Sequence, residues 1–464
     1  MSPSRFLFAG PVLAGLLLVG MLLCPGIPRH GRRIPWQIEP AEVVTTVGER
    51  ISLVPFQIDP STSQPRGFRW SMEGPGPFGT ISPEGLLAAP DTPGSFTVVA
   101  TCRKDGTVLK VPVRICPAVK GWSTSMPSMG WGRSAPAVAL LDGGGLLVAG
   151  QEDPRSSGGY RPGIAPPEHW NPLNQMWNPL PPMARPRNGF HLLPLSEGRA
   201  LAVGGVGEDE AAVRGLEMFE PGPERFREVG GTLFEYQDPA LAILRDGSVL
   251  VTGASPDEDL YRFRKEPGDV RAELLRWDPE AHSYQASPLS APPGAYQKAV
   301  VLPSGRVLLV GFHSNALFDP GTGRFGNRLP FGGRHAFDDG QGRVLVVGPL
   351  GSNPNLFHVR QVDAEAGKTL HEWDVVASEG AAVVRLGDGR LLFAGGRFPT
   401  KDKADVVLFD PSSGLRAELA GLLHRRARAT ALLGQDGRAL FIGGDLQSDL
   451  PTMIVERYEV QGAR

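Results

Sequence analysis

The chain has 464 residues, of which 41% are hydrophobic, 60 are glycine and 45 are proline. Glycine and proline are both well above ordinary usage, which in a chain this apolar indicates many tight turns and excludes disorder as the explanation. The net charge of −2 at pH 7, without a stripe of lysine or arginine, gives no reason to propose nucleic acid or an anionic membrane surface as the main partner.

The first 33 residues form a segment of their own. Arg5 precedes an apolar stretch over residues 6–23, and a polar spacer that contains three arginines follows it. This composition is typical of a signal peptide or membrane anchor. We therefore predict an exported protein of the cell envelope, membrane-anchored or secreted, that meets the membrane only through this segment. Cys24 stands where a lipidated cysteine would, but Leu23 replaces the small residue of that pattern, so cleavage, lipidation and retention stay open.

Residues 34–117 carry a second pattern. Alternating runs at 49–56, 67–72 and 95–102, with a return strand at 107–115, predict a small β-sandwich. The stretch 80–100 resembles the immunoglobulin-like repeats of bacterial surface proteins, which implies a spacer domain. If residues 104–106 are a hairpin tip, Cys102 and Cys116 lie roughly 30 Å apart at the rise of a strand, which favours two free thiols over a disulfide.

From residue 121 onward, one pattern recurs seven times: an apolar run, a turn centred on glycine, a second apolar run that ends in glycine, and an aromatic-acid-proline turn. The terminal glycines are Gly150, Gly204, Gly253, Gly311, Gly348, Gly395 and Gly443. The steps between Gly150 and Gly443 average roughly 49 residues, which is the spacing of a repeat architecture. Each pair of apolar runs predicts a β-hairpin.

The aromatic-acid-proline turns mark the connection between a third and a fourth strand. They stand at Trp170-Asn171-Pro172, Phe219-Glu220-Pro221, Trp277-Asp278-Pro279, Phe318-Asp319-Pro320 and Phe409-Asp410-Pro411. A second aromatic follows seven residues after the first in four copies, as Trp177, Phe226, Tyr284 and Phe325, whereas Thr369 and Arg416 occupy this place in two later copies. The aromatic spacing suits an anchor that packs between neighbouring units.

These residues resemble the kelch motif of bacterial kelch proteins and of the galactose oxidase family, over roughly residues 121–460. The resemblance implies an all-β fold: a seven-bladed kelch-type β-propeller over residues 118–464, preceded by the small immunoglobulin-like β-sandwich of residues 34–117. The last repeat stops after its third strand, and residues 121–127 look like a fourth. We expect this N-terminal strand to complete the last blade and close the ring.

In the galactose oxidase family, tyrosines and histidines hold copper, and one tyrosine is cross-linked to a cysteine. The repeats of this chain contain no cysteine, and phenylalanine, which cannot ligate a metal, precedes His191, His313 and His358. No Gly-x-Ser-x-Gly or His-Glu-x-x-His element occurs either. We therefore predict no metal site and no cofactor, and we assign no catalytic residue.

The innermost strand of each blade lines the central channel of a propeller, and the residues at its start surround one mouth. Polar side chains occupy these starts, and such residues can simply be strand ends that meet water. As candidate ligand-binding residues we take Arg133, His191, Asp238, Lys298, Arg334, His335, Glu379 and Arg428. Their mixed and slightly positive charge suits a polar or anionic ligand.

Two functions remain. The first, which we favour, is an exported, non-enzymatic binding or scaffold protein whose propeller mouth binds a polar or anionic glycan or protein. The alternative is a carbohydrate-active enzyme of the epimerase or lyase type, with His191, His335, Arg334 and Glu379 as acid-base and substrate-holding groups. An enzyme should gather a titratable pair within roughly 3 to 7 Å in a pocket with displaced pKa values, whereas a binding module should show a broad, unpaired rim.

Overall fold

The computed structural model describes residues 36–39, 41–56, 67–117, 119–150, 165–207, 209, 211–254, 270–311, 315–339, 341–350, 353–397, 406–446 and 451–461. Their regular structure is almost entirely β-strand, with one short 3-10 helix, η3 (Asp142–Gly144). The predicted all-β class is therefore confirmed. No helix in these ranges is long and apolar enough to cross a membrane. The predicted signal or anchor segment, residues 1–33, lies outside the described residues.

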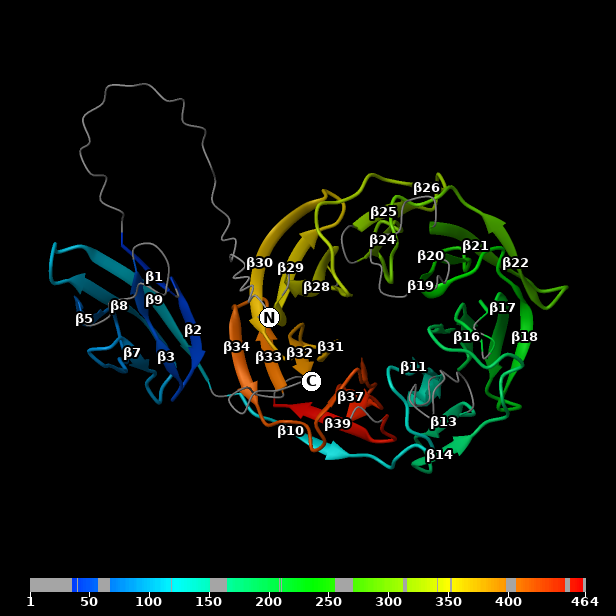
Figure 1. The fold of residues 1–464 in the computed structure, drawn as a ribbon, viewed down its shortest axis with the longest axis horizontal. Helices are drawn as coiled ribbons and strands as arrows, with labels where there is room; N and C mark the ends of the chain where they lie inside the picture. The colour runs from blue at the N-terminus through cyan, green and yellow to red at the C-terminus, as the bar shows by residue number, and fades with distance from the viewer. Residues whose placement is uncertain are drawn as a thin grey trace, which may run out of the picture.

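The N-terminal sheets, residues 36–116, form a small β-structure of their own (Figure 1). One sheet pairs β1 (Gln37–Glu39) with β4 (Val54–Phe56). A second has the order β2 (Val43–Thr46), β9 (Val108–Cys116), β8 (Gly94–Cys102) and β5 (Phe68–Glu73). A third has the order β3 (Arg50–Ser52), β7 (Leu86–Ala88) and β6 (Thr80–Ile81). The predicted run at 49–56 is divided, because the chain changes from one sheet to another at the fully buried Leu53. Cys102 and Cys116 are free thiols.

The repeats fold into four-stranded antiparallel units, which we number one to seven in chain order. Unit one consists of β11 (Ala137–Leu140), β12 (Leu146–Ala149), β13 (Glu168–Asn171) and β14 (Met176–Pro179), and unit two of β15 (His191–Pro194), β16 (Ala200–Val203), β17 (Gly215–Glu220) and β18 (Arg225–Gly231). Unit three consists of β19 (Gln237–Ile243), β20 (Val249–Ala254), β21 (Val270–Asp278) and β22 (Ser283–Pro288). Unit four consists of β23 (Lys298–Val301), β24 (Val307–Val310), β25 (Asn315–Asp319) and β26 (Arg324–Phe325). Units two and three are joined into one eight-stranded sheet by a single parallel pair, Gly230 with Tyr284.

The remaining units follow the same order. Unit five consists of β27 (His335–Asp338), β28 (Arg343–Leu350), β29 (Asn353–Asp363) and β30 (Lys368–Val376). Unit six consists of β31 (Ala382–Arg385), β32 (Leu391–Ala394), β33 (Val406–Asp410) and β34 (Leu415–Leu419). Unit seven consists of β36 (Thr430–Leu433), β37 (Ala439–Ile442), β39 (Val455–Val460) and β10 (Gly121–Ser125). A small two-stranded sheet consists of β35 (Arg426–Ala427) and β38 (Asp445–Leu446). In the sequence, β35 precedes the first strand of unit seven, and β38 lies between β37 and β39. The units stand around a central axis in a closed ring (Figure 1).

The ring closes where the sequence predicts it. Strand β10 pairs antiparallel with β39 over five residues, from Gly121 opposite Val460 to Ser125 opposite Glu456. The N-terminal end of the repeat region thus supplies the outer strand of unit seven. This arrangement leaves no unpaired edge between the first and the last unit, which is the purpose of such closure.

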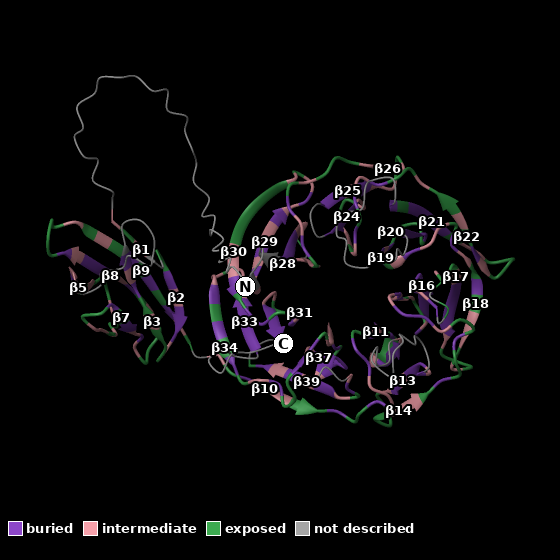
Figure 2. Cartoon of the chain, viewed as in Figure 1, coloured by how far each residue is buried: buried purple, intermediate pink, exposed green. Residues whose placement is uncertain are grey.

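The hydrophobic core of the ring is divided into clusters, each of which lies between two successive units. One cluster joins Leu147 of β12 to Phe190 and Phe219 of unit two, and another joins Leu392 of unit six to Phe441 of unit seven. Buried residues accordingly lie along the strands all round the ring (Figure 2). Because each unit covers both faces of its sheet with its neighbours, the second strands read as continuous apolar runs.

The paired aromatics are cross-strand partners within one sheet. Ring centroids lie 5.5 Å apart for Trp170 and Trp177, 5.7 Å for Phe219 and Phe226, 5.1 Å for Trp277 and Tyr284, and 4.9 Å for Phe318 and Phe325. The same register sets Thr369 opposite Val362 in unit five and Arg416 opposite Phe409 in unit six. The aromatic pair is therefore missing from units five and six, and also from unit seven, where Ser123 lies opposite Tyr458.

Candidate functional site

The starts of the inner strands lie at one end of the ring, which we call the mouth. Within each unit the strands are antiparallel, so the inner strand begins at the same end at which the second strand finishes. The hairpins between the first two strands, and the turns between the third and fourth, lie at the opposite end, which we call the base. The predicted ligand-binding residues belong to the mouth end.

Three ionisable residues occupy equivalent positions at the mouth. His191, Lys298 and His335 each begin an inner strand, and each pairs with the residue before the terminal glycine of the second strand. The other units carry small residues in the same register: Ala137, Ala240, Ala382 and Thr430. Small side chains beside long polar ones leave room for a ligand within reach of the polar groups.

Lys298 is electrostatically coupled to His191, Asp238 and His335. We call these four residues the Lys298 cluster. Burial, with the nearby Lys298 ammonium, lowers the pKa of both histidines to about 3. Burial also lowers the pKa of Lys298, although Asp238 opposes it, and burial raises the pKa of Asp238, although Lys298 opposes it. Since Lys298 acts on residues of units two, three and five, the cluster draws on four successive units.

Water still reaches this cluster. Lys298 and Asp238 expose side-chain surface, and the two histidines are partly exposed. The desolvation of these side chains is therefore partial. It shifts the pKa of each group in the direction that favours its uncharged form. The His191 imidazole also donates a hydrogen bond to the carbonyl of Pro239, and the His335 ring is parallel to Phe337, 6.3 Å away between centroids.

The backbone at Asp238 is strained in a way that recurs around the mouth. Asp238 has a φ of 45° and Arg428 a φ of 54°, in the left-handed region that residues other than glycine rarely adopt. Hydrogen bonds between units hold both, because the Asp238 N–H donates to the Gly189 carbonyl (2.8 Å) and the Arg428 N–H donates to the Gly380 carbonyl (3.2 Å). Such strain persists where the surroundings impose it, which is common at functional sites.

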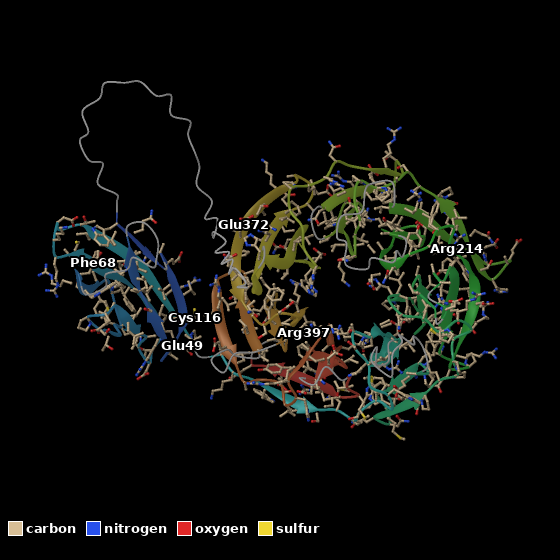
Figure 3. All side chains as sticks on the ribbon, in the orientation of Figure 1. Glu49, Phe68, Cys116, Arg214, Glu372 and Arg397 are labelled. Atoms are coloured by element: carbon tan, nitrogen blue, oxygen red, sulfur yellow. The ribbon has the colours of Figure 1, made fainter. Side chains whose placement is uncertain are left out.

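Arg334 and Glu379 extend the cluster toward unit six. Arg334 is exposed beside His335, and burial of its guanidinium lowers its pKa while the Glu379 carboxylate raises it. The backbone of Glu379 forms a bridge with Arg397, which lies on the inner side of the ring (Figure 3). The mouth thus places a cation, its acidic neighbour and the Lys298 cluster on adjoining units.

The structure places the last two predicted residues differently. Arg428 lies at the mouth but forms an ion pair with the buried Asp445, and the pKa shifts of the Lys298 cluster do not include it. Arg133 is fully buried, with Glu168 3.1 Å away and the Gly150 carbonyl accepting a hydrogen bond at 2.9 Å. The prediction that Arg133 binds a ligand at the mouth is therefore wrong, because its charge is used inside the blade.

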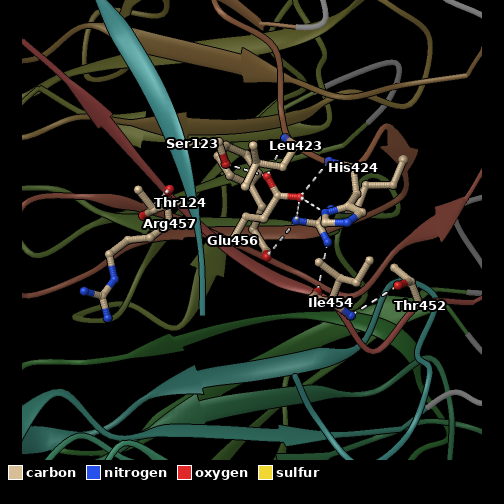
Figure 4. A network of polar contacts seen from close by, with 10 residues as sticks. Ser123, Thr124, Leu423, His424, Thr452, Ile454, Glu456 and Arg457 are labelled. Carbon is tan, nitrogen blue, oxygen red and sulfur yellow. Dashed lines mark hydrogen bonds and ion pairs between the residues drawn. The ribbon is translucent and has the colours of Figure 1, made fainter. Parts of the chain in front are cut away.

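Arg133 belongs to a recurring structural device that the sequence analysis missed. Arg187 pairs with Glu217, and Arg426 with Glu456, and all of these side chains are buried. In Figure 4 the Glu456 carboxylate also accepts the N–H groups of Leu423 and His424. The available signal was a glutamate two residues before the third-strand aromatic, as in Glu168-His169-Trp170, Glu217-Met218-Phe219 and Glu456-Arg457-Tyr458.

The two partly buried, neutral histidines should make the fold sensitive to acid. Their pKa changes from 6.5 in a free imidazole to about 3 at the mouth, so between these values the unfolded chain binds more protons than the folded one. This stability is present above pH 6.5 and is lost as the pH falls toward 3. We expect His191→Gln/His335→Gln to lose less free energy of unfolding than the wild type between about pH 7 and pH 4, measured by urea titration. Equal losses would contradict this account.

Comparison with known proteins identifies the fold. No protein-family model matches the chain, and no curated protein matches its sequence. A fungal alcohol oxidase of the AA5 family, solved in complex with copper, aligns with a TM-score of 0.50 and 15% identity over 73% of this chain and 76% of the oxidase. The structure of YjhT covers 73% of this chain and 100% of its own, with a TM-score of 0.42 and 14% identity. The oxidase confirms the β-propeller-like fold.

This comparison corrects our functional prediction. We favoured a non-enzymatic binding or scaffold protein, and one solved structure that shares the fold is an alcohol oxidase. The mouth also carries titratable residues with displaced pKa values, which is one part of what we expected of an enzyme. The non-enzymatic prediction is therefore wrong, and these observations favour the enzymatic alternative.

Copper does not suit the residues of this mouth. In the described part of the chain, no three His, Cys, Asp or Glu side chains are placed to hold a metal ion together. Tyr236, Tyr296 and Tyr458 are buried in the clusters between units, and burial raises the pKa of each hydroxyl, which disfavours the phenolate that a metal would bind. The free cysteines belong to the N-terminal sheets.

Proposed function

We propose that the protein is a carbohydrate-active enzyme of the epimerase or lyase type that acts on acidic sugars at the mouth. The observation that carries this proposal is the Lys298 cluster, in which ionisable groups from four successive units influence one another and are displaced toward their uncharged forms. Pairs of acids and bases with displaced pKa values are typical of sites that transfer protons.

The arrangement suits removal of a proton from the carbon next to a carboxylate. A lowered pKa raises the fraction of Lys298 that is a neutral amine, so its Nζ can take the proton. The Arg334 guanidinium would bind the substrate carboxylate and stabilise the charge that develops on it. The uncharged imidazoles of His191 and His335 would contact the sugar hydroxyls.

The two reaction types differ in the fate of the electron pair left on that carbon. In an epimerase, the electron pair takes a proton from the opposite face, and the configuration is inverted. In a lyase, the electron pair forms a double bond as the carbon–oxygen bond at the next position breaks, and the leaving oxygen takes a proton. Asp238, whose pKa is raised, is the acid of the Lys298 cluster that could supply one.

The test is proton exchange on acidic sugars. Wild-type protein would be incubated in D2O with disaccharides of hexuronic acids, and deuterium in the sugar and an unsaturated product would be followed by mass spectrometry. We expect Lys298→Met to slow the reaction by roughly 10² to 10⁴-fold, the range for loss of a general base, without lowering the melting temperature. Lys368→Met, at an exposed position of β30, is the matched control.

Two outcomes would contradict the proposed function. One is wild-type protein that exchanges no proton with any of the acidic disaccharides. The other is a Lys298→Met variant as active as the control.

The remaining expectations belong to this proposal. The aromatic-acid-proline turns and their regular spacing support a seven-bladed propeller of the kelch type over residues 118–464. The sheet order of residues 34–117 supports an immunoglobulin-like spacer. The apolar stretch over residues 6–23 supports export to the cell envelope, where acidic glycans are the partner and the membrane is met only through residues 1–33.

A further inference from the structure

A polar cleft of about 930 Å³ lies between the N-terminal sheets and the base of units five and six. Val44 and Thr45 of β2 line one side. The hairpins and turns of the base line the other, including Gln341 and residues 410–414. The Arg114 guanidinium donates a hydrogen bond to the Ser413 carbonyl, which joins the two sides. The volume falls in the range of small-molecule and saccharide sites.

The cleft lies over two of the units that depart from the repeat. The fourth-strand aromatic of units one to four is replaced by Thr369 in unit five and by Arg416 in unit six. Arg416 lines the cleft with an exposed side chain. In unit six the departure from the repeat therefore places a cation where units one to four place an aromatic ring.

The acids of the cleft are largely engaged, whereas two of its arginines form no ion pair with a carboxylate of the described residues. The Asp339 carboxylate lies 3.5 Å from Arg343, and Asp388 lies 2.6 Å from Arg390. Asp410 accepts hydrogen bonds from the hydroxyls of its own turn, at 2.7 Å and 2.6 Å.

Within the described ranges, Arg385 and Arg416 have no such carboxylate partner. The Nη2 of Arg385 donates a hydrogen bond of 3.5 Å to the Asp339 backbone carbonyl, and its Nε is buried and has no hydrogen-bond partner among the described residues. Arg416 has only the electrostatic influence of Asp374. Glu42 adds one negative charge to the lining. The two guanidinium groups therefore remain available to an anionic ligand.

An aromatic surface lies beside these cations. Trp373 and His371 stack at 5.6 Å between ring centroids with 27° between their planes, and both line the cleft. Flat aromatic rings next to planar hydrogen-bonding groups suit a sugar, which offers an apolar face and a rim of hydroxyls. A peptide of acidic residues would need the cations but not the rings.

We propose that this cleft binds a segment of an acidic polysaccharide, with carboxylates at Arg385 and Arg416 and one sugar ring against Trp373. The site lies at the base, opposite the mouth, and does not depend on the reaction proposed there. It would hold a polymeric substrate or a cell-envelope glycan to the protein while the mouth remains open.

The test is calorimetric titration of the full chain with an oligogalacturonate, with its neutral counterpart of equal length and with oligoglutamate. We expect Arg385→Gln/Arg416→Gln to weaken oligogalacturonate binding by about tenfold or more, the loss expected for charged hydrogen bonds. Trp373→Leu should weaken it too. Arg276→Gln is the matched control, because Arg276 is an exposed cation near the hairpin of unit three. Each titration is repeated in a Lys298→Met/Arg334→Gln background, which separates the cleft from the mouth.

The proposal is overturned if binding in that background is the same for Arg385→Gln/Arg416→Gln and for Arg276→Gln. Oligoglutamate that binds as tightly as oligogalacturonate, with no effect of Trp373→Leu, would overturn it in favour of an acidic protein partner. Loss of all binding in the Lys298→Met/Arg334→Gln background alone would assign the glycan to the mouth and overturn the cleft.

Discussion

Replacing Glu456 by leucine is expected to lower the free energy of unfolding by about 3 to 5 kcal/mol, the loss found when one partner of a buried ion pair is removed. Both Arg426 and Glu456 are buried, and their charged groups lie 3.2 Å apart. The change leaves the Arg426 guanidinium unpaired and removes the acceptor of two backbone N–H groups. Urea denaturation of the full chain measures the loss.

Two variants make this test specific. Glu459→Gln, on the same strand and partly exposed beside Arg438, should cost only about 0 to 1 kcal/mol. Arg426→Met/Glu456→Leu removes both charges and should recover part of the loss, because no unpaired charge remains buried. Equal destabilisation by Glu456→Leu and Glu459→Gln would show that the buried pair has no special role.

A chain that begins at residue 130 is expected to aggregate or unfold, whereas one that begins at residue 117 should fold. The shorter chain lacks β10 and so exposes the edge of β39, to which β10 is paired over five residues. It also lacks Met126 and Met129, which are buried in the cluster between units seven and one. At about 1.5 to 3 kcal/mol for each buried methionine side chain, their loss alone costs roughly 3 kcal/mol or more.

Thermal unfolding followed by circular dichroism, with light scattering for aggregation, distinguishes the two chains. A cooperative transition at the same temperature in both would contradict the closure by β10.

A single substitution in β10 tests the same closure in a second way. A side chain at Gly121 would lie 2.7 Å from the ring of Tyr458, so Gly121→Val should destabilise the longer chain, and Trp122→Ser, at an exposed site, should not.

The fold could be predicted from the sequence because its signals repeat. The glycine-centred turns and the aromatic-acid-proline turns recur in the same order along the chain, so each copy supports the others, and even the strand supplied by residues 121–127 was expected from an incomplete last repeat. The division of 49–56 at Leu53 was missed, because alternation along a strand does not show where the chain changes sheets.

The site could be predicted only in part. The strand starts that form the mouth follow from the repeat, which is why His191, Lys298 and His335 were included. Polarity at a strand start does not show whether a side chain is exposed, and so Arg133 was included although it pairs with Glu168 inside its blade. The cleft at the base was beyond reach, because it joins β2 to residues more than 300 positions away, such as Arg385 and Arg416.

The central claim is that Lys298 stands in a coupled cluster that favours its neutral amine. The most direct measurement is a titration of Lys298 by NMR in protein with isotope-labelled lysine, for the wild type and for Asp238→Asn. The account predicts that Lys298 titrates below the ordinary pKa of 10.5 and that Asp238→Asn lowers its pKa further, because the carboxylate opposes the effect of burial. A Lys298 that titrates at 10.5 and is unaffected by Asp238→Asn would contradict it.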